Sequence, residues 1–310
     1  MAALILTAAA HAQSYPAKAV RIIVPVAPGG GTDPQARLLG KKFQESMGQT
    51  FVIENRTGAA SMIGTEFVVK SPPDGYTLLC AASTLAGAYT LRKDLSFDLL
   101  KDLAPVGQIS SAAQFLVVHS SVPVSSVKEF IALAKKQSGK MNAASGGSGS
   151  ANHLTLEMFK QRAGIQAMHI AYKGSGPATI ALMSGEVDFS FAGALTSLPH
   201  IRSGRIKALA VTTPKPSPLV PGAPPLTSLY PGFESTNWYG VFAPAGTPAA
   251  IVGRISQEIA SAIRLSDVRE FMAKEGADPV GSTPQEFAGF FKSEVDRYAR
   301  VIRSANIRAD

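Results

Sequence analysis

Short apolar runs alternate with stretches of helix-like spacing along most of this chain. Residues 20–26 are rich in β-branched side chains, which predicts a strand, and the glycines at 29–31 follow it as a turn. Thr32 or Asp33 is then expected to cap a helix that has Pro34 at its first position. The apolar face of this helix consists of Leu38, Leu39, Phe43 and Met47. The repeated strand–helix–strand order predicts an α/β fold with a mostly parallel sheet between helices.

The same two patterns predict the other elements. Strands are expected at residues 51–53, 76–80, 115–118, 141–144, 168–170, 187–191, 208–211 and 238–243. Helices are expected at residues 62–70, 126–137, 151–163, 177–184, 251–263, 268–274 and 284–302. The stretch 214–225 is rich in proline, and we expect it to be an irregular surface connection.

The rhythm of strands and helices restarts after residue 110, which indicates two lobes. We expect lobe 1 to consist of residues 13–110 and 239–310, and lobe 2 of residues 111–238. The chain would cross between the lobes twice, near residues 110 and 238, and two crossings form a hinge. The region between the lobes is then the expected place for a ligand.

Composition and charge narrow the classes of function. The 310 residues include 30 Lys or Arg and 22 Asp or Glu, which gives a net charge of +8. The longest basic runs are only Lys41-Lys42 and Lys135-Lys136, so we exclude a nucleic-acid partner. The single cysteine, Cys80, excludes a disulfide framework and a cysteine-based zinc site. No run of eighteen apolar residues occurs, so no membrane-spanning helix is predicted.

The first residues resemble the end of a secretory signal. Residues 1–10 are apolar and rich in alanine, and Ala10-His11-Ala12 has the small-x-small pattern of a cleavage site. We expect residues 1–12 to be a signal-peptide remnant, although the basic segment that begins such signals is missing. The alternative is a short buried helix. Secretion predicts a location in the periplasm. No cysteine lies near the cleavage point, so we expect no lipid anchor.

Three glycine-rich loops follow predicted strands: residues 27–33 (loop one), 145–150 (loop two) and 172–177 (loop three). Each precedes a helix, where free backbone amides and the helix dipole attract an anion. Ligands of open α/β sheets bind at this edge. A carboxylate is therefore the expected ligand, with the alternative that the loops are only tight connections.

Sequence motifs for nucleotide binding, nucleophilic catalysis and metal binding are absent, because the residues do not have the required spacing. The dinucleotide-binding motif needs a glycine at position 34, where this chain has Pro34. No glycine-rich segment ends in the Gly-Lys-Ser/Thr sequence of a P-loop. A nucleophile elbow around Ser148 needs glycine in place of Ser150. The histidines form no pair with metal-ligand spacing. We therefore expect no metal ion, no cofactor and no enzymatic activity, and an α/β hydrolase is the weaker alternative.

Three ionisable residues are ambiguous. His153 lies near the start of a predicted helix, where it suits a ligand contact as well as a surface or capping position. Asp188 lies within a predicted strand and either faces the ligand edge or bonds local backbone. Asp33 is expected to cap its helix and so to shape loop one.

A series of motifs is distributed in order over nearly the whole chain. They are Tyr15-Pro16 with Lys18, Ile23-Val24-Pro25 with Pro28-Gly29-Gly30, Val52 and Glu54-Asn55-Arg56 with Gly58-Ala59, Asp74-Gly75-Tyr76-Thr77-Leu78, loop two with His153-Leu154, Tyr172-Lys173-Gly174, Gly185 with Val187-Asp188, and Ala243-Pro244 with Gly246-Thr247-Pro248. Together they resemble the Bug-type extracytoplasmic solute receptors of tripartite tricarboxylate transporters.

The resemblance implies a two-lobed, type II-like periplasmic binding protein that closes on a small mono-, di- or tricarboxylate. In such receptors, main-chain amides and ordered water hold one carboxylate against the first loop, and a Ser/Thr/Gly loop of the second lobe contacts the ligand from the other side. Integral-membrane transporter subunits are the implied partners, and we expect the receptor to be a monomer. A ligand-reporting subunit for a membrane sensor kinase is an alternative that would use the same site.

The loops and the resemblance together predict a set of ligand-binding residues. The set is Pro28, Gly29, Gly30, Gly31, Thr32, Asp33, Ser83 and Thr84 in lobe 1, and Ser145, Gly146, Gly147, Ser148, Gly149, Ser150, His153, Tyr172 and Asp188 in lobe 2. Ser83 and Thr84 are included on the resemblance alone. We expect Ser148 and Ser150 to be binding residues and not nucleophiles.

Overall fold

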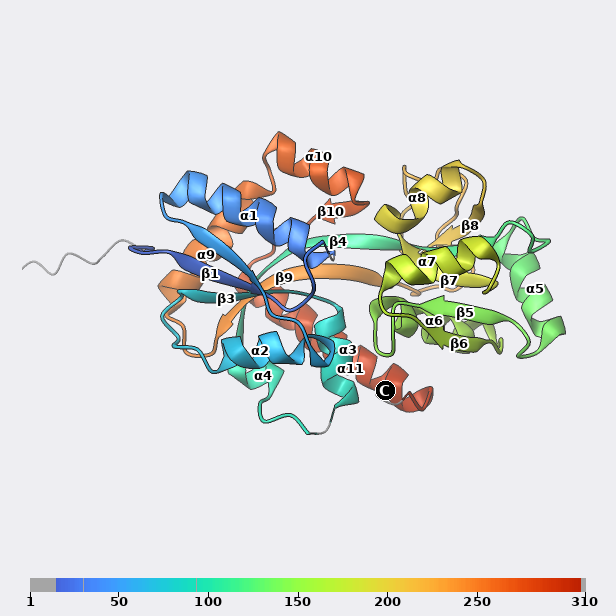
Figure 1. The fold of residues 1–310 in the computed structure, drawn as a ribbon, viewed down its shortest axis with the longest axis horizontal. Helices are drawn as coiled ribbons and strands as arrows, with labels where there is room; N and C mark the ends of the chain where they lie inside the picture. Colours follow the sequence, from blue (N-terminus) through green and yellow to red (C-terminus); the bar gives the residue numbers. More distant parts are fainter. Residues whose placement is uncertain (1–14, 30, 93, 308–310) are drawn as a thin grey trace, which may run out of the picture.

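The structure is a computed structural model that describes residues 15–29, 31–92 and 94–307 (Figure 1). The predicted signal remnant, residues 1–12, and Gly30 lie outside the described residues. The strands are β1 (Val20–Val24), β2 (Phe51–Asn55), β3 (Thr77–Ala82), β4 (Leu103–His119), β5 (Asn142–Ser145), β6 (Met168–Ala171), β7 (Phe189–Gly193), β8 (Ile206–Val211), β9 (Thr236–Pro244) and β10 (Ala277–Pro279). The helices are α1 (Thr32–Met47), α2 (Met62–Val69), α3 (Thr84–Leu91), α4 (Leu99–Asp102), α5 (Val127–Gln137), α6 (Ala151–Ala163), α7 (Ser175–Ser184), α8 (Ala194–Arg202), α9 (Ala249–Ala262), α10 (Ser266–Lys274) and α11 (Pro284–Ser304), with short 3-10 helices η1 (Ala59–Ser61) and η2 (Leu226–Ser228). Within these described ranges, no helix combines the length and the apolar composition needed to cross a membrane.

The strands form a mixed sheet in the order β2-β1-β3-β9-β4-β7-β5-β6, and β8 and β10 also pair with β4. The parallel pairing that the sequence predicts occurs within each lobe: β1 pairs with β2 and β3, and β5 pairs with β6 and β7. Every ladder that includes β4 or β9 is antiparallel. The predicted α/β class is thus confirmed, with antiparallel strands where the lobes join.

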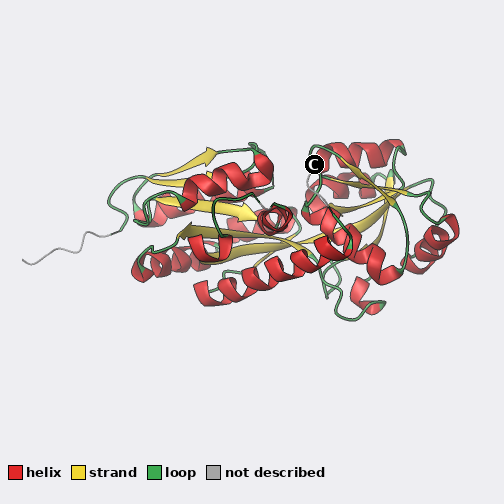
Figure 2. Ribbon diagram, turned by 90° about the horizontal axis from the view of Figure 1, so that it is seen from below, coloured by secondary structure: helices red, strands yellow, loops and turns green. Residues whose placement is uncertain are grey.

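Two long strands, β4 and β9, extend from one lobe toward the other (Figure 1). Figure 2 shows long strands that connect the two groups of helices. Their pairing extends from Leu103 opposite Pro244 to Ala113 opposite Thr236. From Gln114 onward, β4 pairs with β7 and β8 instead. Residues 110 and 238, where we expect the chain to cross between the lobes, therefore lie inside a hydrogen-bonded ribbon.

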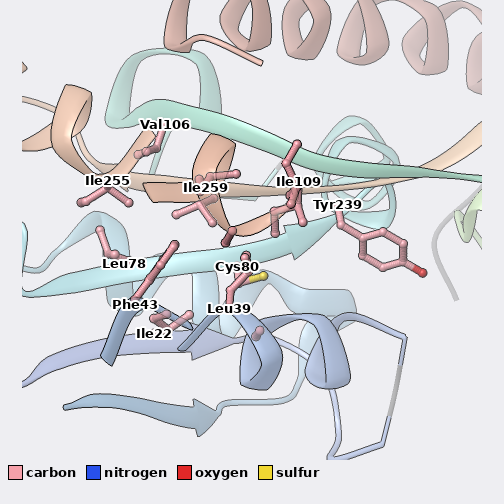
Figure 3. Packing of buried hydrophobic residues seen from close by; sticks show 14 of the residues in the cluster. Ile22, Leu39, Phe43, Leu78, Cys80, Val106, Ile109, Tyr239, Ile255 and Ile259 are labelled. Carbon is pink, nitrogen blue, oxygen red and sulfur yellow. The ribbon is translucent and has the colours of Figure 1, made fainter. Parts of the chain in front are cut away.

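Apolar side chains pack against both faces of the sheet in each lobe. On one face of lobe 1, Ile22 and Leu78 cluster with Ile259 of α9 (Figure 3). On the other face, the Phe242 ring lies 4.9 Å from the Phe291 ring of α11. Lobe 2 has one core under α5 and α6 and another under α7 and α8. The helices thus cover both faces, as the alternation of strands and helices predicts.

Side chains outside the ribbon also join the lobes. Leu154 of α6 is fully buried within the lobe 1 core that includes the aromatic rings of α11. Gln161 Nε2 donates a hydrogen bond to Ser304 Oγ over 2.9 Å. Arg297 Nη1 donates to the Glu234 carbonyl over 2.5 Å. Helix α11 therefore contacts both lobes along its length.

Gly240 of β9 tests the packing of α11 on the ribbon. A Cβ at this position would overlap the Phe287 ring of α11. We expect Gly240→Ala to lower the free energy of unfolding by roughly 1–3 kcal/mol, because a close-packed core must shift to admit the methyl group. Gly253→Ala in α9 is the matched control, since a Cβ there has open space, and better helix propensity should raise stability by about 0.5–1 kcal/mol. Urea denaturation measures both, and equal stabilities would contradict this packing.

Candidate functional site

Loop one is shaped by the buried carboxylate of Asp33. Asp33 Oδ2 accepts hydrogen bonds from the Gly29 amide and from Arg37 Nε, both over 3.0 Å. Its Oδ1 accepts from Asn55 Nδ2 over 2.9 Å, which ties the loop to the end of β2. Burial alone would raise the pKa of Asp33, but these hydrogen bonds and the Arg37 charge together lower it.

The prediction that Thr32 or Asp33 caps α1 is wrong. The N-cap residue is Gly31, and it has no side-chain capping bond. The helix starts at Thr32, so Asp33 lies inside the first turn, Pro34 follows at the third position, and the carboxylate turns back to the loop. The prediction that Asp33 shapes loop one is confirmed. Gly29, Gly31, Thr32 and Asp33 lie together here with Pro28, whereas Gly30 is outside the described residues.

A chain of polar side chains leads from loop one to the start of α3. A Cβ on Gly31 would lie only 2.8 Å from Tyr239 Oη, so the loop lies directly on this hydroxyl. Asn237 Nδ2 donates to Tyr239 Oη over 2.7 Å, and Ser83 Oγ donates to Asn237 Oδ1 over 2.5 Å. Ser83 is fully buried and precedes α3, which begins at Thr84. Ser83 and Thr84 are therefore brought to the same edge as loop one.

Sequence reasoning missed Asn237 and Tyr239. Figure 3 shows the Tyr239 hydroxyl directed away from the apolar cluster that its ring joins. Burial, and then the charges of Glu275 and Cys80, raise the pKa of Tyr239, so the hydroxyl keeps its proton. The available signal was the polar character of these two side chains at the start of an otherwise apolar strand.

Loop two is closed by its own hydrogen bonds. Its amides donate as follows: Gly146 to Asn152 Oδ1 (3.3 Å), Gly147 to Ser145 Oγ (3.1 Å), Gly149 to His153 Nδ1 (3.1 Å) and Ser150 to the Gly147 carbonyl (3.1 Å). The expectation that these four amides stand free for an anion is therefore wrong. Their side-chain acceptors come from the strand before the loop and the helix after it, and they make the loop a fixed structure.

Ser150 is the N-cap of α6. Its Oγ accepts from the His153 amide over 3.4 Å and lies 2.6 Å from the Gly147 carbonyl. Loss of an N-cap side chain costs about 1 kcal/mol. A change at Ser150 would thus act on folding as well as on any ligand, whereas Ser148, in the middle of the loop, is not a cap.

His153 supports loop two through a hydrogen bond to the Gly149 amide. Its ring is buried and stacks on the His169 ring, with centroids 3.7 Å apart. Burial, and then the charges of His169 and Lys160, lower the pKa of His153 to about 3. The neutral ring accepts the Gly149 amide on Nδ1, so its proton is on Nε2. His153 is thus neither a surface residue nor a helix cap.

Ser145 and His169 have the spacing of a nucleophile and its base, because Ser145 Oγ lies 2.6 Å from His169 Nε2. Ser145 is fully buried, however, and its Oγ also accepts the Gly147 amide. A substrate cannot reach this oxygen without opening the loop, so the pair positions loop two. No group of three or more metal-ligating side chains occurs among the described residues.

Loop three lies beside loop two, but two predicted lobe 2 residues point elsewhere. The Gly174 amide donates to the Gly146 carbonyl over 3.2 Å. The Tyr172 hydroxyl donates to Glu186 Oε1 over 2.7 Å, which ties this side chain to the end of α7. Asp188 accepts from the Asn142 amide over 2.7 Å at the amino end of β5, opposite loop two. The inclusion of Asp188 is therefore wrong, and its alternative, a bond to local backbone, is confirmed.

Helix α3 brings the two halves of the site together. A Cβ on Gly87 would overlap the Gly149 carbonyl of loop two, and a Cβ on Gly149 would overlap Leu91. Loop two of lobe 2 thus packs directly on a lobe 1 helix that begins beside loop one. The arrangement offers hydroxyl groups and helix starts for hydrogen bonding to a small polar ligand.

Comparison with known proteins gives consistent matches. The model of the family described as "Tripartite tricarboxylate transporter family receptor" matches residues 35–307. BugT of Bordetella pertussis (strain Tohama I) is 37% identical over 306 residues, which cover 98% of this chain and 94% of that protein. The resemblance that the motifs predict is thereby confirmed.

Two solved structures are similar over nearly their whole length. An R. palustris protein with adipate is 32% identical, with a TM-score of 0.85, and the match covers 96% of this chain and 100% of that chain. MatC from Rhodopseudomonas palustris with bound malate is 29% identical, with a TM-score of 0.80, and the match covers 93% of this chain and 100% of that chain. The predicted two-lobed fold of periplasmic binding proteins is confirmed by this likeness.

Asp33→Asn tests the anchoring of loop one. We expect a loss of roughly 1.5–3 kcal/mol in the free energy of unfolding at pH 7, because hydrogen bonds to a charged acceptor disappear. The folded-state pKa of Asp33 lies below its unfolded value, so its stabilisation is complete above the unfolded pKa and is lost as pH falls through the folded pKa. The difference between wild type and variant should therefore shrink below about pH 4.

Asp296→Asn is the matched control for Asp33. Asp296 is half-exposed in α11 and pairs with Lys292 across one helical turn. Such a surface ion pair contributes at most about 0.5 kcal/mol. Urea denaturation between pH 3 and pH 7 measures both variants, and a pH-independent loss in Asp33→Asn would show that its charge does not anchor the loop.

Gly87→Ala tests the contact between α3 and loop two. The added methyl group would displace the Gly149 carbonyl, so we expect amides 146–150 to exchange with deuterium at least tenfold faster. Gly289→Ala in α11 is the control, because a Cβ there has open space. Mass-spectrometric hydrogen exchange compares the two variants. Unchanged protection of the loop two amides in Gly87→Ala would contradict the contact between this loop and α3.

Proposed function

The chain belongs to the family of tripartite tricarboxylate transporter receptors, and from this we propose that it captures a small carboxylate between its lobes in the periplasm. Integral-membrane transporter subunits then receive the loaded protein. The ligand class is supported by the two similar proteins that were solved with adipate and with malate. Both ligands are small aliphatic dicarboxylates, and the proposal extends to other small mono-, di- and tricarboxylates.

The observation that carries the proposal is that two helices begin at one edge of lobe 1 and that loop two packs on the second of them. Helices α1 and α3 both begin at the edge where loop one and Ser83 lie. The first amides of a helix have no acceptor inside the helix, and they favour an anion. Loop two contacts α3 from lobe 2. A carboxylate bound to the helix starts would therefore lie within reach of both lobes.

Binding of this kind favours a closed arrangement of the lobes. A ligand held by lobe 1 alone would bind the open and closed states with equal affinity, so it would not shift the equilibrium between them. A ligand that also contacts loop two makes its full set of contacts only in the closed state. The closed surface is then what the membrane subunits would recognise as loaded.

Calorimetric titration with adipate, malate, citrate and benzoate tests this function. We expect at least one of these acids to bind with a Kd below about 10 µM, since about 7 kcal/mol is within reach of a few charge-assisted hydrogen bonds. Mass spectrometry of the recovered ligand should show no chemical change, and small-angle scattering at saturation should show a smaller radius of gyration.

Sugars and polyamines of similar size are the control ligands. Heat only with these neutral or cationic compounds, or recovery of a hydrolysed ligand, would contradict the proposal. An unchanged radius of gyration at proven saturation would leave carboxylate binding intact but exclude closure of the lobes.

A further inference from the structure

Helix α5 lies across the end of lobe 2 that is farthest from lobe 1 (Figure 1). The chain enters this helix after His119, the last residue of β4, and then continues to Asn142, the first residue of β5. Strand β8 begins at the same end, because Ile206 pairs with His119. Loop two follows the opposite end of β5. This end of lobe 2, which we call the distal end, is therefore separate from the proposed ligand site.

Lobe 2 carries most of the net positive charge of the protein. Residues 111–238 include 11 Lys or Arg and 5 Asp or Glu, so they contribute +6 to the net charge of +8. Six exposed basic side chains belong to the distal end: Lys128, Lys135, Lys136, Lys140, Arg202 and Arg205. None of the six forms an ion pair with a carboxylate of the described residues. The sequence has no long basic run, so it is the fold that gathers these charges.

The carboxylates of the distal end are fewer, and each is already bonded. Glu129, Glu186 and Asp188 each accept a hydrogen bond from another residue of lobe 2, over 2.8, 2.7 and 2.7 Å. Three carboxylates do not balance six cations, and the distal end is therefore positively charged.

The helix dipole accounts for only part of this charge. Lys135 and Lys136 lie in the last turn of α5, where a cation is stabilising. Lys128 lies in the first turn, where a cation is unfavourable, and Lys140 lies between α5 and β5. Lys128 and Lys135 are two helical turns apart, so they project from the same exposed face of α5. The outer face of this helix is thus basic along its length.

We propose that the distal end of lobe 2 binds the surface of an anionic phospholipid bilayer. Each basic side chain close to such a surface strengthens binding about fivefold. The six cations are spread over α5, the segment before β5 and the turn before β8, and lysine carries its charge on a long flexible stem. This arrangement suits a mobile layer of many headgroups better than one defined acidic site.

Binding through the distal end leaves loop two uncovered, because this loop follows the other end of β5. The protein would be concentrated at the membrane in which the proposed transporter subunits lie. The contact needs no carboxylate ligand, so its test is independent of the proposed function.

Co-sedimentation with vesicles measures this binding. We expect the protein to partition at least about tenfold more strongly onto phosphatidylcholine vesicles with about 30% phosphatidylglycerol than onto phosphatidylcholine alone. About 0.5 M salt should abolish the difference, because salt screens exposed charges. The triple variant Lys135→Gln, Lys136→Gln, Lys140→Gln should bind the anionic vesicles at least about tenfold more weakly. It should keep the wild-type Tm, since all three side chains are exposed.

The triple variant Lys41→Gln, Arg264→Gln, Arg269→Gln is the matched control, because it removes the same charge from exposed positions of lobe 1. Its binding to the anionic vesicles should stay within about twofold of wild type, since charges far from the contact are screened. Equal losses in the two triple variants would show that net charge alone is responsible and would overturn the role of the distal end. Equal partition of the wild-type protein onto both kinds of vesicle would do the same. Retention on immobilised poly-L-glutamate without binding to vesicles would overturn the lipid partner in favour of an acidic protein surface.

Discussion

The antiparallel pairing of β4 with β9 is the constraint on which the rest of the structure depends. The ladder continues from Leu103 opposite Pro244 to Ala113 opposite Thr236, through the point where the chain changes lobe. Because backbone hydrogen bonds fix the register, the strands of lobe 1 and of lobe 2 keep a set position along one ribbon. The polar positions Asn237 and Tyr239 reach the edge with loop one only because β9 holds this register. The closure that we propose would then require bending and twisting of this ribbon.

Most of the fold could be predicted because its elements carry local signals. The run at residues 20–26 and the helix-like spacing after Pro34 gave β1 and α1 nearly at their observed bounds. Helices α3 and α8 were missed, because Thr84–Leu91 and Ala194–Arg202 are short and mix apolar with polar residues at no clear period. Residues 103–114 of β4 were also missed, since Pro105 and Gly107 disfavour a strand and are tolerated only at its irregularities. Local patterns cannot reveal a strand whose partner, β9, lies 130 residues further along the chain.

The positions of the three loops could be predicted from the sequence, but their hydrogen bonding could not. Parallel strands place their carboxyl ends at one edge, so loops one, two and three could be located from the sequence. The sequence could not show that Asp33 turns back to the Gly29 amide, or that His153 accepts the Gly149 amide. Both bonds depend on side-chain rotamers and on burial, and these follow from tertiary packing. Asp188 illustrates the same limit, because it lies at the amino end of its strand and only the parallel pairing of β5 with β7 shows that this end is opposite loop two.

The closed hydrogen bonding of loop two determines which parts of the proposed site can respond to a ligand. The amides of Gly146, Gly147, Gly149 and Ser150 already have acceptors, and exchanging one acceptor for another yields little net free energy. The donors that gain most from a carboxylate are those without an acceptor, and the first amides of a helix have none inside the helix. In the proposed site, lobe 1 would then provide the main anion site, and loop two, which α3 already contacts, would form a wall.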